Sequence, residues 1–123
     1  MRRQRTRNTL PEVVVRRALR ELGMSYRTCN SDLAGSPDAA NRKRRWAVFV
    51  HGCFWHHHDG CRRATVPKRN HAFWLAKFAQ NRERDARAAR ELRSLGFRVV
   101  TVWECETRGP GSTLSRKLRS LGA

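Results

Sequence analysis

Four histidines, two cysteines and a Phe-Trp pair lie within fourteen residues, in the segment VFVHGCFWHHHDGC at 48–61. Thiolate sulfur and imidazole nitrogen are the ligands that zinc prefers in proteins. One loop and a cysteine further along the chain can together supply a tetrahedral set, namely Cys53, His58, Cys61 and Cys105. Because their spacing matches no standard zinc-finger pattern, buried unreactive cysteines are the alternative.

A magnesium site is the second chemistry that the sequence offers. Asp38 lies twelve residues before Val50, the penultimate residue of an apolar segment that ends at His51. Mg²⁺ prefers carboxylate and carbonyl oxygens and is often shared with a phosphate, so the Asp38 carboxylate and the Val50 carbonyl are candidate ligands. His51 and His56 are candidates for activating water or stabilising charge. The alternative for Asp38 is an ordinary turn aspartate.

Three more residues allow two interpretations each. Glu12 ends the capping-box pattern TLPE, yet it also lies three residues before Val15 on an apolar helical face. It is therefore either a helix cap or a functional acid turned inward. Phe54 and Trp55 either pack in the core or insert between base steps of a duplex.

The elements that position these residues follow from hydrophobic periodicity. TLPE at 9–12 and Gly23 predict a first helix between them, and WAVFV at 46–50 predicts a buried strand. FRVVTVW at 97–103 predicts a second buried strand. With a further strand before the basic run RKRR, the order helix, strand, strand, helix, strand indicates a compact α/β domain. The segment 109–123 is expected to be a basic tail or a short helix.

A long helix is expected from an Asn70 cap to about Leu95, where Gly96 ends it. Its predicted core-facing stripe is Leu75, Phe78, Ala79, Ala86, Ala89 and Leu92.

The charge of the chain indicates its partner. Among 123 residues, 27 are Lys or Arg and 10 are Asp or Glu, which gives a net charge of +17. Such a surface favours a polyanion, and nucleic acid is the leading partner. No apolar stretch approaches the roughly 20 residues of a membrane-spanning helix, and the basic N-terminus lacks the apolar core of a signal peptide. We therefore expect a cytoplasmic single-domain protein whose cysteines are thiols or metal ligands, with Cys29 as a small core residue.

With these residues in place, the chain resembles the very-short-patch repair endonucleases, the bacterial mismatch nicking enzymes. The motifs that carry the resemblance occur in order over residues 1 to 108: TLPE, LAGSPD, VFVHGCFWHHH, PKRN, NRERD and LGFRVVTVWEC. The combination of HGCFWH with a downstream VWEC is distinctive.

The resemblance implies a restriction-endonuclease-like mixed sheet flanked by helices, with a structural zinc held by Cys53, His58, Cys61 and Cys105. It also implies a monomer that uses Mg²⁺ to nick one strand 5′ to the thymine of a T·G mismatch in double-stranded DNA. Such mismatches form when 5-methylcytosine deaminates. Asp38 and the Val50 main chain would hold magnesium, His56 would be the general base, and Glu12 and His51 would orient metal-bound water. Phe54 and Trp55 would form a wedge beside the mismatch.

The basic residues expected on the DNA backbone are Arg42, Lys43, Arg44, Arg45, Lys68 and Arg69. The sequence departs from the family pattern in three places: a short basic arm at 1–8, the polar stretch AANRKRR after Asp38, and an additional Gly60 before Cys61. Two alternatives stay open: a related nicking or homing-type endonuclease with another target, and a zinc-stabilised DNA-binding module whose active site has decayed.

Overall fold

The computed structural model describes residues 10–54, 56, 58, 60–62, 64–108 and 111–122. Its elements are α1 (Leu10–Glu21), β1 (Ala39–Asn41), β2 (Trp46–His51), α2 (His71–Ser94), β3 (Arg98–Trp103), the 3-10 helix η1 (Glu104–Thr107) and α3 (Gly111–Arg119). The predicted order of helices and strands is confirmed. Within these residues, no helix has the length and apolar character needed to cross a membrane.

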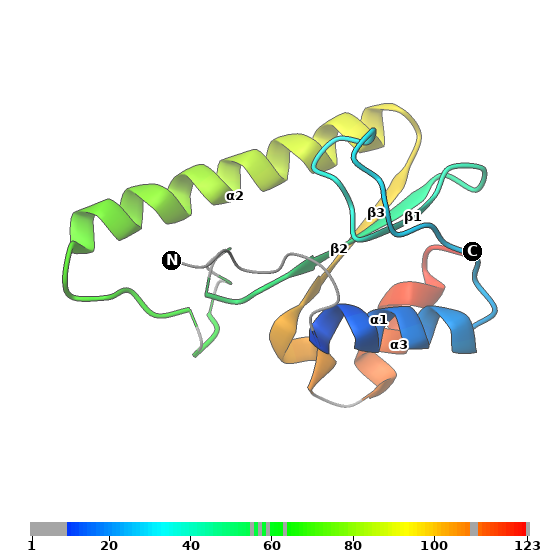
Figure 1. Cartoon of the computed structure of the whole chain (residues 1–123), viewed down its shortest axis with the longest axis horizontal. Coiled ribbons are helices and arrows are strands. Elements are labelled where there is room, and N and C mark those ends of the chain that lie inside the picture. The colour runs from blue at the N-terminus through cyan, green and yellow to red at the C-terminus, as the bar shows by residue number, and fades with distance from the viewer. Residues whose placement is uncertain are drawn as a thin grey trace.

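The sheet has three strands in the order β1-β2-β3. β1 pairs antiparallel with β2, whereas β2 and β3 are parallel, so the sheet is mixed, as expected. The long helix α2 lies along one side of the sheet, and α1 and α3 lie together on the other (Figure 1). Of the stretch AANRKRR after Asp38, only Ala39–Asn41 forms a strand, in which Ala39 and Ala40 are 1% exposed, and 42–45 form a turn.

Both faces of the sheet are covered by apolar side chains. The face toward α1 and α3 has the larger cluster: Val15, Leu19, Ala39, Trp46, Val48, Val102, Leu114, Leu118 and Leu121. The face toward α2 has a smaller one: Ala40, Ala47, Phe49, Ala88 and Leu92. The C-terminal segment is thus a helix that contributes leucines to the core.

The predicted apolar stripe of α2 is only partly correct: Phe78 and Leu92 are buried and Ala89 is half-buried. Leu75 is 47% exposed, and Ala79 and Ala86 are exposed as well, whereas Asn81 and Ala88 are buried. The first half of α2 extends beyond the sheet (Figure 1), so Leu75 and Ala79 have no sheet to pack against.

Two further local predictions are wrong. Asn70 precedes α2 in a left-handed conformation, with φ 57° and ψ 41°, and its side chain makes no capping hydrogen bond. Asparagine tolerates this conformation, which leaves its side chain badly placed for a cap. Cys29 is exposed in the segment between α1 and β1 and is not a core residue.

The loop that leads to Asp38 packs closely on α2 at Gly35. Gly35 has φ +74°, and a Cβ atom at this position would lie 2.7 Å from the Ala88 Cβ and 3.0 Å from the Phe49 ring. Only glycine fits both the conformation and the space. This close approach brings the start of β1 against the second half of α2.

We expect Leu118→Ala to destabilise the protein by about 2–5 kcal/mol, because the Leu118 side chain is fully buried between α3 and the sheet. Leu95→Ala is the matched control, since Leu95 is 54% exposed and its truncation should cost less than about 0.5 kcal/mol. Urea denaturation measures both. Equal losses would show that α3 does not contribute to the core.

Candidate active site and metal centre

The parallel pairing of β2 and β3 creates the edge on which the site is built. His51, the last residue of β2, pairs with Trp103, the last residue of β3. Both strands therefore end at the same level. Cys53 follows two residues after His51, and Cys105 follows two residues after Trp103. The register of two strands thus places these cysteines side by side.

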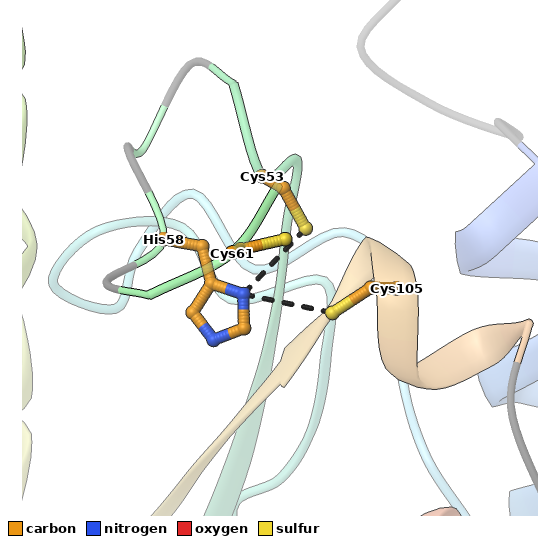
Figure 2. A group of neighbouring side chains, drawn as sticks. All are labelled: Cys53, His58, Cys61 and Cys105. Atoms are coloured by element: carbon orange, nitrogen blue, oxygen red, sulfur yellow. Dashed lines mark hydrogen bonds between the residues drawn. The ribbon is translucent and has the colours of Figure 1, made fainter. Parts of the chain in front are cut away.

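The four sulfur and nitrogen ligands predicted for zinc meet at this edge (Figure 2). One ligand atom from each of Cys53, His58, Cys61 and Cys105 lies within 4.8 Å of the others. His58 Nδ1 is 3.7 Å from Cys53 Sγ and 3.6 Å from Cys105 Sγ. Zinc bonds of about 2.3 Å to sulfur and 2.0 Å to nitrogen at tetrahedral angles would separate such atoms by about 3.5 Å. The residues therefore fit a zinc ion, and Gly60 does not prevent Cys61 from joining them.

The two cysteines at the strand ends need a compensating cation to carry a negative charge here. Cys53 is fully buried, and burial raises the pKa of its thiol to about 12. Burial raises the pKa of Cys105 as well. A neutral cluster of thiols gains little from this arrangement, whereas a zinc ion would deprotonate them and neutralise their charge.

Asp38 is held at the start of β1 by the backbone of β2. Its N–H donates to the Val48 carbonyl at 2.9 Å, and its carboxylate accepts a 2.6 Å hydrogen bond from the Val50 N–H. In an extended strand, the N–H and C=O of one residue point to the same side, so the Val50 carbonyl also faces the Asp38 side of β2. The pairing of β1 with β2 ends at Ala39 and Val48, which leaves the Val50 carbonyl outside this ladder.

Glu12 is an inward-facing acid. Its side chain is only 11% exposed, and with Asp38 it lines a cavity of about 450 Å³. Burial, followed by the charge of Glu12, raises the pKa of Asp38 to about 7. Arg16 Nη2 lies 3.4 Å from Glu12 Oε1 and offsets part of the charge. The two half-buried carboxyl groups still repel each other, and a cation would offset the remaining negative charge.

Two histidines and an aspartate also line this cavity, namely His51, His56 and Asp85. The rings of His51 and His56 stack 3.8 Å apart, within 3° of parallel. The His56 Nδ1 atom lies 2.6 Å from Asp85 Oδ2. Burial, followed by the charge of His56, lowers the pKa of His51 to about 4, so His51 is neutral. The hydrogen bond with His56 lowers the pKa of Asp85 despite the opposing effect of burial.

Asp85 was missed by the sequence analysis, although it lies in the NRERD motif. It follows Asn81 by four residues and precedes Ala88 by three, so it lies on the buried face of α2. An acid on a core-facing helical stripe is a signal of function, but the predicted stripe left out Asn81 and Ala88, which are buried. A stripe through these two positions would have included Asp85.

The structure places one of the two wedge residues. The half-buried Phe54 ring packs edge-on against Trp74 and Phe78 of α2, with centroids 5.7 Å and 5.3 Å away. Phe73, the neighbour of Trp74, is 60% exposed. Trp55 lies outside the described residues.

The predicted DNA-backbone residues lie in two separate places. Arg42 to Arg45 form the turn between β1 and β2, at the end of β2 opposite His51. Five residues of strand separate these ends by about 17 Å. Within this turn, Arg42 pairs with Asp32, and Arg45 donates to the Leu95 carbonyl. Lys68 and Arg69 are exposed in the loop before α2.

Comparisons with known proteins identify the family. Residues 1–63 match the family described as DNA mismatch endonuclease Vsr. The type II nicking enzyme V.XorIIP of Xanthomonas oryzae pv. oryzae is 42% identical over 121 residues, which cover 98% of this chain and 88% of that protein. The type II nicking enzyme V.NmeAIP of Neisseria meningitidis is also 42% identical, over 94% of this chain and 84% of its own length. The DNA mismatch endonuclease Vsr of Escherichia coli is 42% identical over 89% of this chain and 69% of its own length.

These similarities span both the strand end that carries Asp38 and the histidine-rich loop. The chain belongs to the DNA mismatch endonuclease Vsr family and is an endonuclease that acts on DNA.

Proposed function

We propose that this endonuclease uses Mg²⁺ to nick one DNA strand 5′ to the thymine of a T·G mismatch produced by deamination of 5-methylcytosine. The observation that carries the proposal is the convergence of five predicted residues on one cavity of about 450 Å³: Glu12, Asp38, Val50, His51 and His56. One active site of this kind in the described part of a monomer suits a nick, because a double-strand cut needs two active sites. Its restriction-endonuclease-like core would consist of the mixed sheet and the helices on its two faces.

The donor set at Asp38 fits magnesium. The Asp38 carboxylate and the Val50 carbonyl are hard oxygen ligands on one side of β2, and the nearby Glu12 carboxylate adds negative charge. When bound there, Mg²⁺ supplies Lewis-acid stabilisation of the phosphate and activates water. Glu12 and His51 would orient the attacking water.

His56 would act as the general base. A carboxylate can only accept hydrogen bonds, so the contact with Asp85 keeps the proton of neutral His56 on Nδ1. The Nε2 atom then has a lone pair that can take a proton from water. Asp85 is a positioning residue in this scheme: it holds the ring and selects its tautomer, and it stabilises the charge that the ring gains.

Zinc would have a structural role. Held by Cys53, His58, Cys61 and Cys105, it would tie the histidine-rich loop to the ends of β2 and β3. His56 lies in this loop between the ligands Cys53 and His58, so the zinc would also fix the position of the base.

Substrate selection would use the aromatic residues and the basic surface. The Phe54 ring packs against the rings of Trp74 and Phe78. Together with Trp55, Phe54 would insert beside the mismatch. A mismatched pair is weakly held, so unstacking it costs less than unstacking a paired step. Phosphate contacts from 42–45 and from Lys68 and Arg69 would hold the duplex.

A second candidate is a nicking endonuclease with a different target. The observation that favours it is that several relatives are named type II nicking enzymes.

Asp38→Asn tests the metal site and the substrate together. On end-labelled duplexes that differ only in one T·G or T·A pair, we expect the unmodified enzyme to nick the T·G duplex alone, 5′ to the thymine and only with Mg²⁺. Asp38→Asn should slow nicking by about 10²-fold or more, because it removes a charged ligand, and should leave DNA binding and zinc content unchanged.

The matched control is Asp32→Asn, because Asp32 is 43% exposed and lies outside the cavity. It should stay within about threefold of the unmodified rate, as expected for a surface substitution. Undiminished nicking by Asp38→Asn would contradict the magnesium site. Equal nicking of both duplexes would favour the second candidate.

The raised pKa of Asp38 predicts a pH-dependent affinity for magnesium. Below the value of about 7, a proton occupies the carboxylate and competes with the cation. The apparent Mg²⁺ affinity should therefore fall by about tenfold for each pH unit below 7 and level off above it. Nicking rates at a series of Mg²⁺ concentrations and pH values would measure this. An affinity that does not change between pH 5.5 and 8 would be inconsistent with a buried, protonated Asp38.

The zinc assignment predicts a large loss of stability in Cys105→Ser. The purified protein should hold one tightly bound zinc per chain, and this variant should lose it. Its Tm should fall by roughly 10 °C or more, because the loop would no longer be tied to β3. Cys29→Ser is the control, since Cys29 is exposed and far from the cluster in sequence. Similar zinc content and Tm in both variants would rule the site out.

A further inference from the structure

A second group of metal-binding side chains lies beside the predicted zinc cluster. His51, His56 and Asp85 each place one ligand atom within 4.8 Å of the others. The Asp85 Oδ2 atom is 2.6 Å from His56 Nδ1 and 3.9 Å from His51 Nδ1. His51 is 8% exposed, and its Nδ1 atom is buried. This atom has no hydrogen-bond partner among the described residues.

We infer that His51, His56 and Asp85 form a second transition-metal site, at which Zn²⁺ or a similar ion switches the nuclease off. The inhibitory part of this inference rests on the proposed role of His56 as the base. The binding part depends only on the three side chains.

The geometry requires small adjustments. Bonds of about 2.0–2.1 Å at tetrahedral angles separate ligand atoms by about 3.3 Å. The observed 2.6 Å and 3.9 Å lie on either side of this value, so each contact needs to change by less than about 0.8 Å. Imidazole lone pairs lie in the ring plane, and the two stacked rings lie in parallel planes 3.8 Å apart at their centroids, so the rings must tilt to share one ion. His51 ends a strand, whereas His56 lies in a loop, and we expect His56 to move.

The ligands select against magnesium. Two imidazole nitrogens and one carboxylate oxygen suit Zn²⁺, Co²⁺, Ni²⁺ and Cu²⁺, whereas Mg²⁺ requires oxygen ligands. The magnesium ligands proposed above, Asp38 and the Val50 carbonyl, are not members of this set. The two sites therefore share a cavity but no ligand.

An ion at this position would disable the base without blocking the wedge or the zinc loop. A neutral imidazole carries one proton, and His56 keeps it on Nδ1 in the contact with Asp85. When a metal takes the Nδ1 lone pair, the proton must move to Nε2. The Nε2 atom then has no lone pair to receive a proton from water, so nicking stops.

Equilibrium dialysis against Co²⁺, without DNA or Mg²⁺, of protein that holds one zinc at the cysteine cluster and none at the second site tests the binding. We expect one additional equivalent of Co²⁺ that lacks the thiolate charge-transfer absorption of a cysteine site. His51→Ala and Asp85→Ala should each weaken this equivalent by at least about tenfold, because each removes one of three ligands. His71→Ala is the matched control, since His71 is exposed at the start of α2 and should bind as the unmodified protein does.

The outcomes separate this inference from the proposed function. Asp38→Asn should keep the additional equivalent, which shows that it is not bound at the magnesium site. The inference is wrong if the unmodified protein takes up no additional Co²⁺, or if His51→Ala and Asp85→Ala bind it as tightly as His71→Ala does. Circular dichroism and retained structural zinc would establish that the variants are folded. None of these results depends on whether the enzyme nicks a T·G mismatch.

The inhibition is measured separately. With structural zinc in place and Mg²⁺ held constant, buffered Zn²⁺ should reduce nicking at the concentrations that fill the second site. A tenfold increase in Mg²⁺ should restore little activity, because the sites share no ligand. Full recovery in high Mg²⁺ would show that Zn²⁺ competes at Asp38 and would overturn the inhibitory mechanism.

Discussion

The parallel register of β2 and β3 is the constraint on which both chemical centres depend. It ends the two strands at the same level, with His51 opposite Trp103. The residues that follow, Cys53 and Cys105, then lie beside each other. A shift of one residue would turn His51 to the other face of the sheet and separate the cysteines. The hydrophobic core on both faces of the sheet therefore determines the geometry of the polar edge.

The same short loop serves two purposes. His51 precedes Cys53 by two residues, and His56 lies between the predicted ligands Cys53 and His58. A zinc ion would fix the backbone of this loop, and Asp85 would then fix the orientation of the His56 ring. A small protein with little room for a supporting shell can in this way use a metal in place of a second layer of packed side chains.

The cavity combines groups that are unfavourable without a cation. Asp38 is raised in pKa by burial and by Glu12, and His51 is buried with one ring nitrogen unpaired. Such features lower stability, and they persist where function requires them. The chain concentrates them at the end of one strand and places its apolar contacts on the two faces of the sheet. The groups of the site that lower stability are thus confined to one edge of the sheet.

The sequence by itself determined the chemistry and the order of elements. Ligand types and hydrophobic periodicity are local properties, so the Cys53 loop, the strands and the candidate Asp38 could all be predicted. Only the tertiary structure decided which of the apolar positions along α2 are buried, because the sheet covers just part of that helix. That packing brings Asp85 to His56. The packing of α3 and the exposure of Cys29 were decided in the same way, because burial depends on segments that are distant in the sequence.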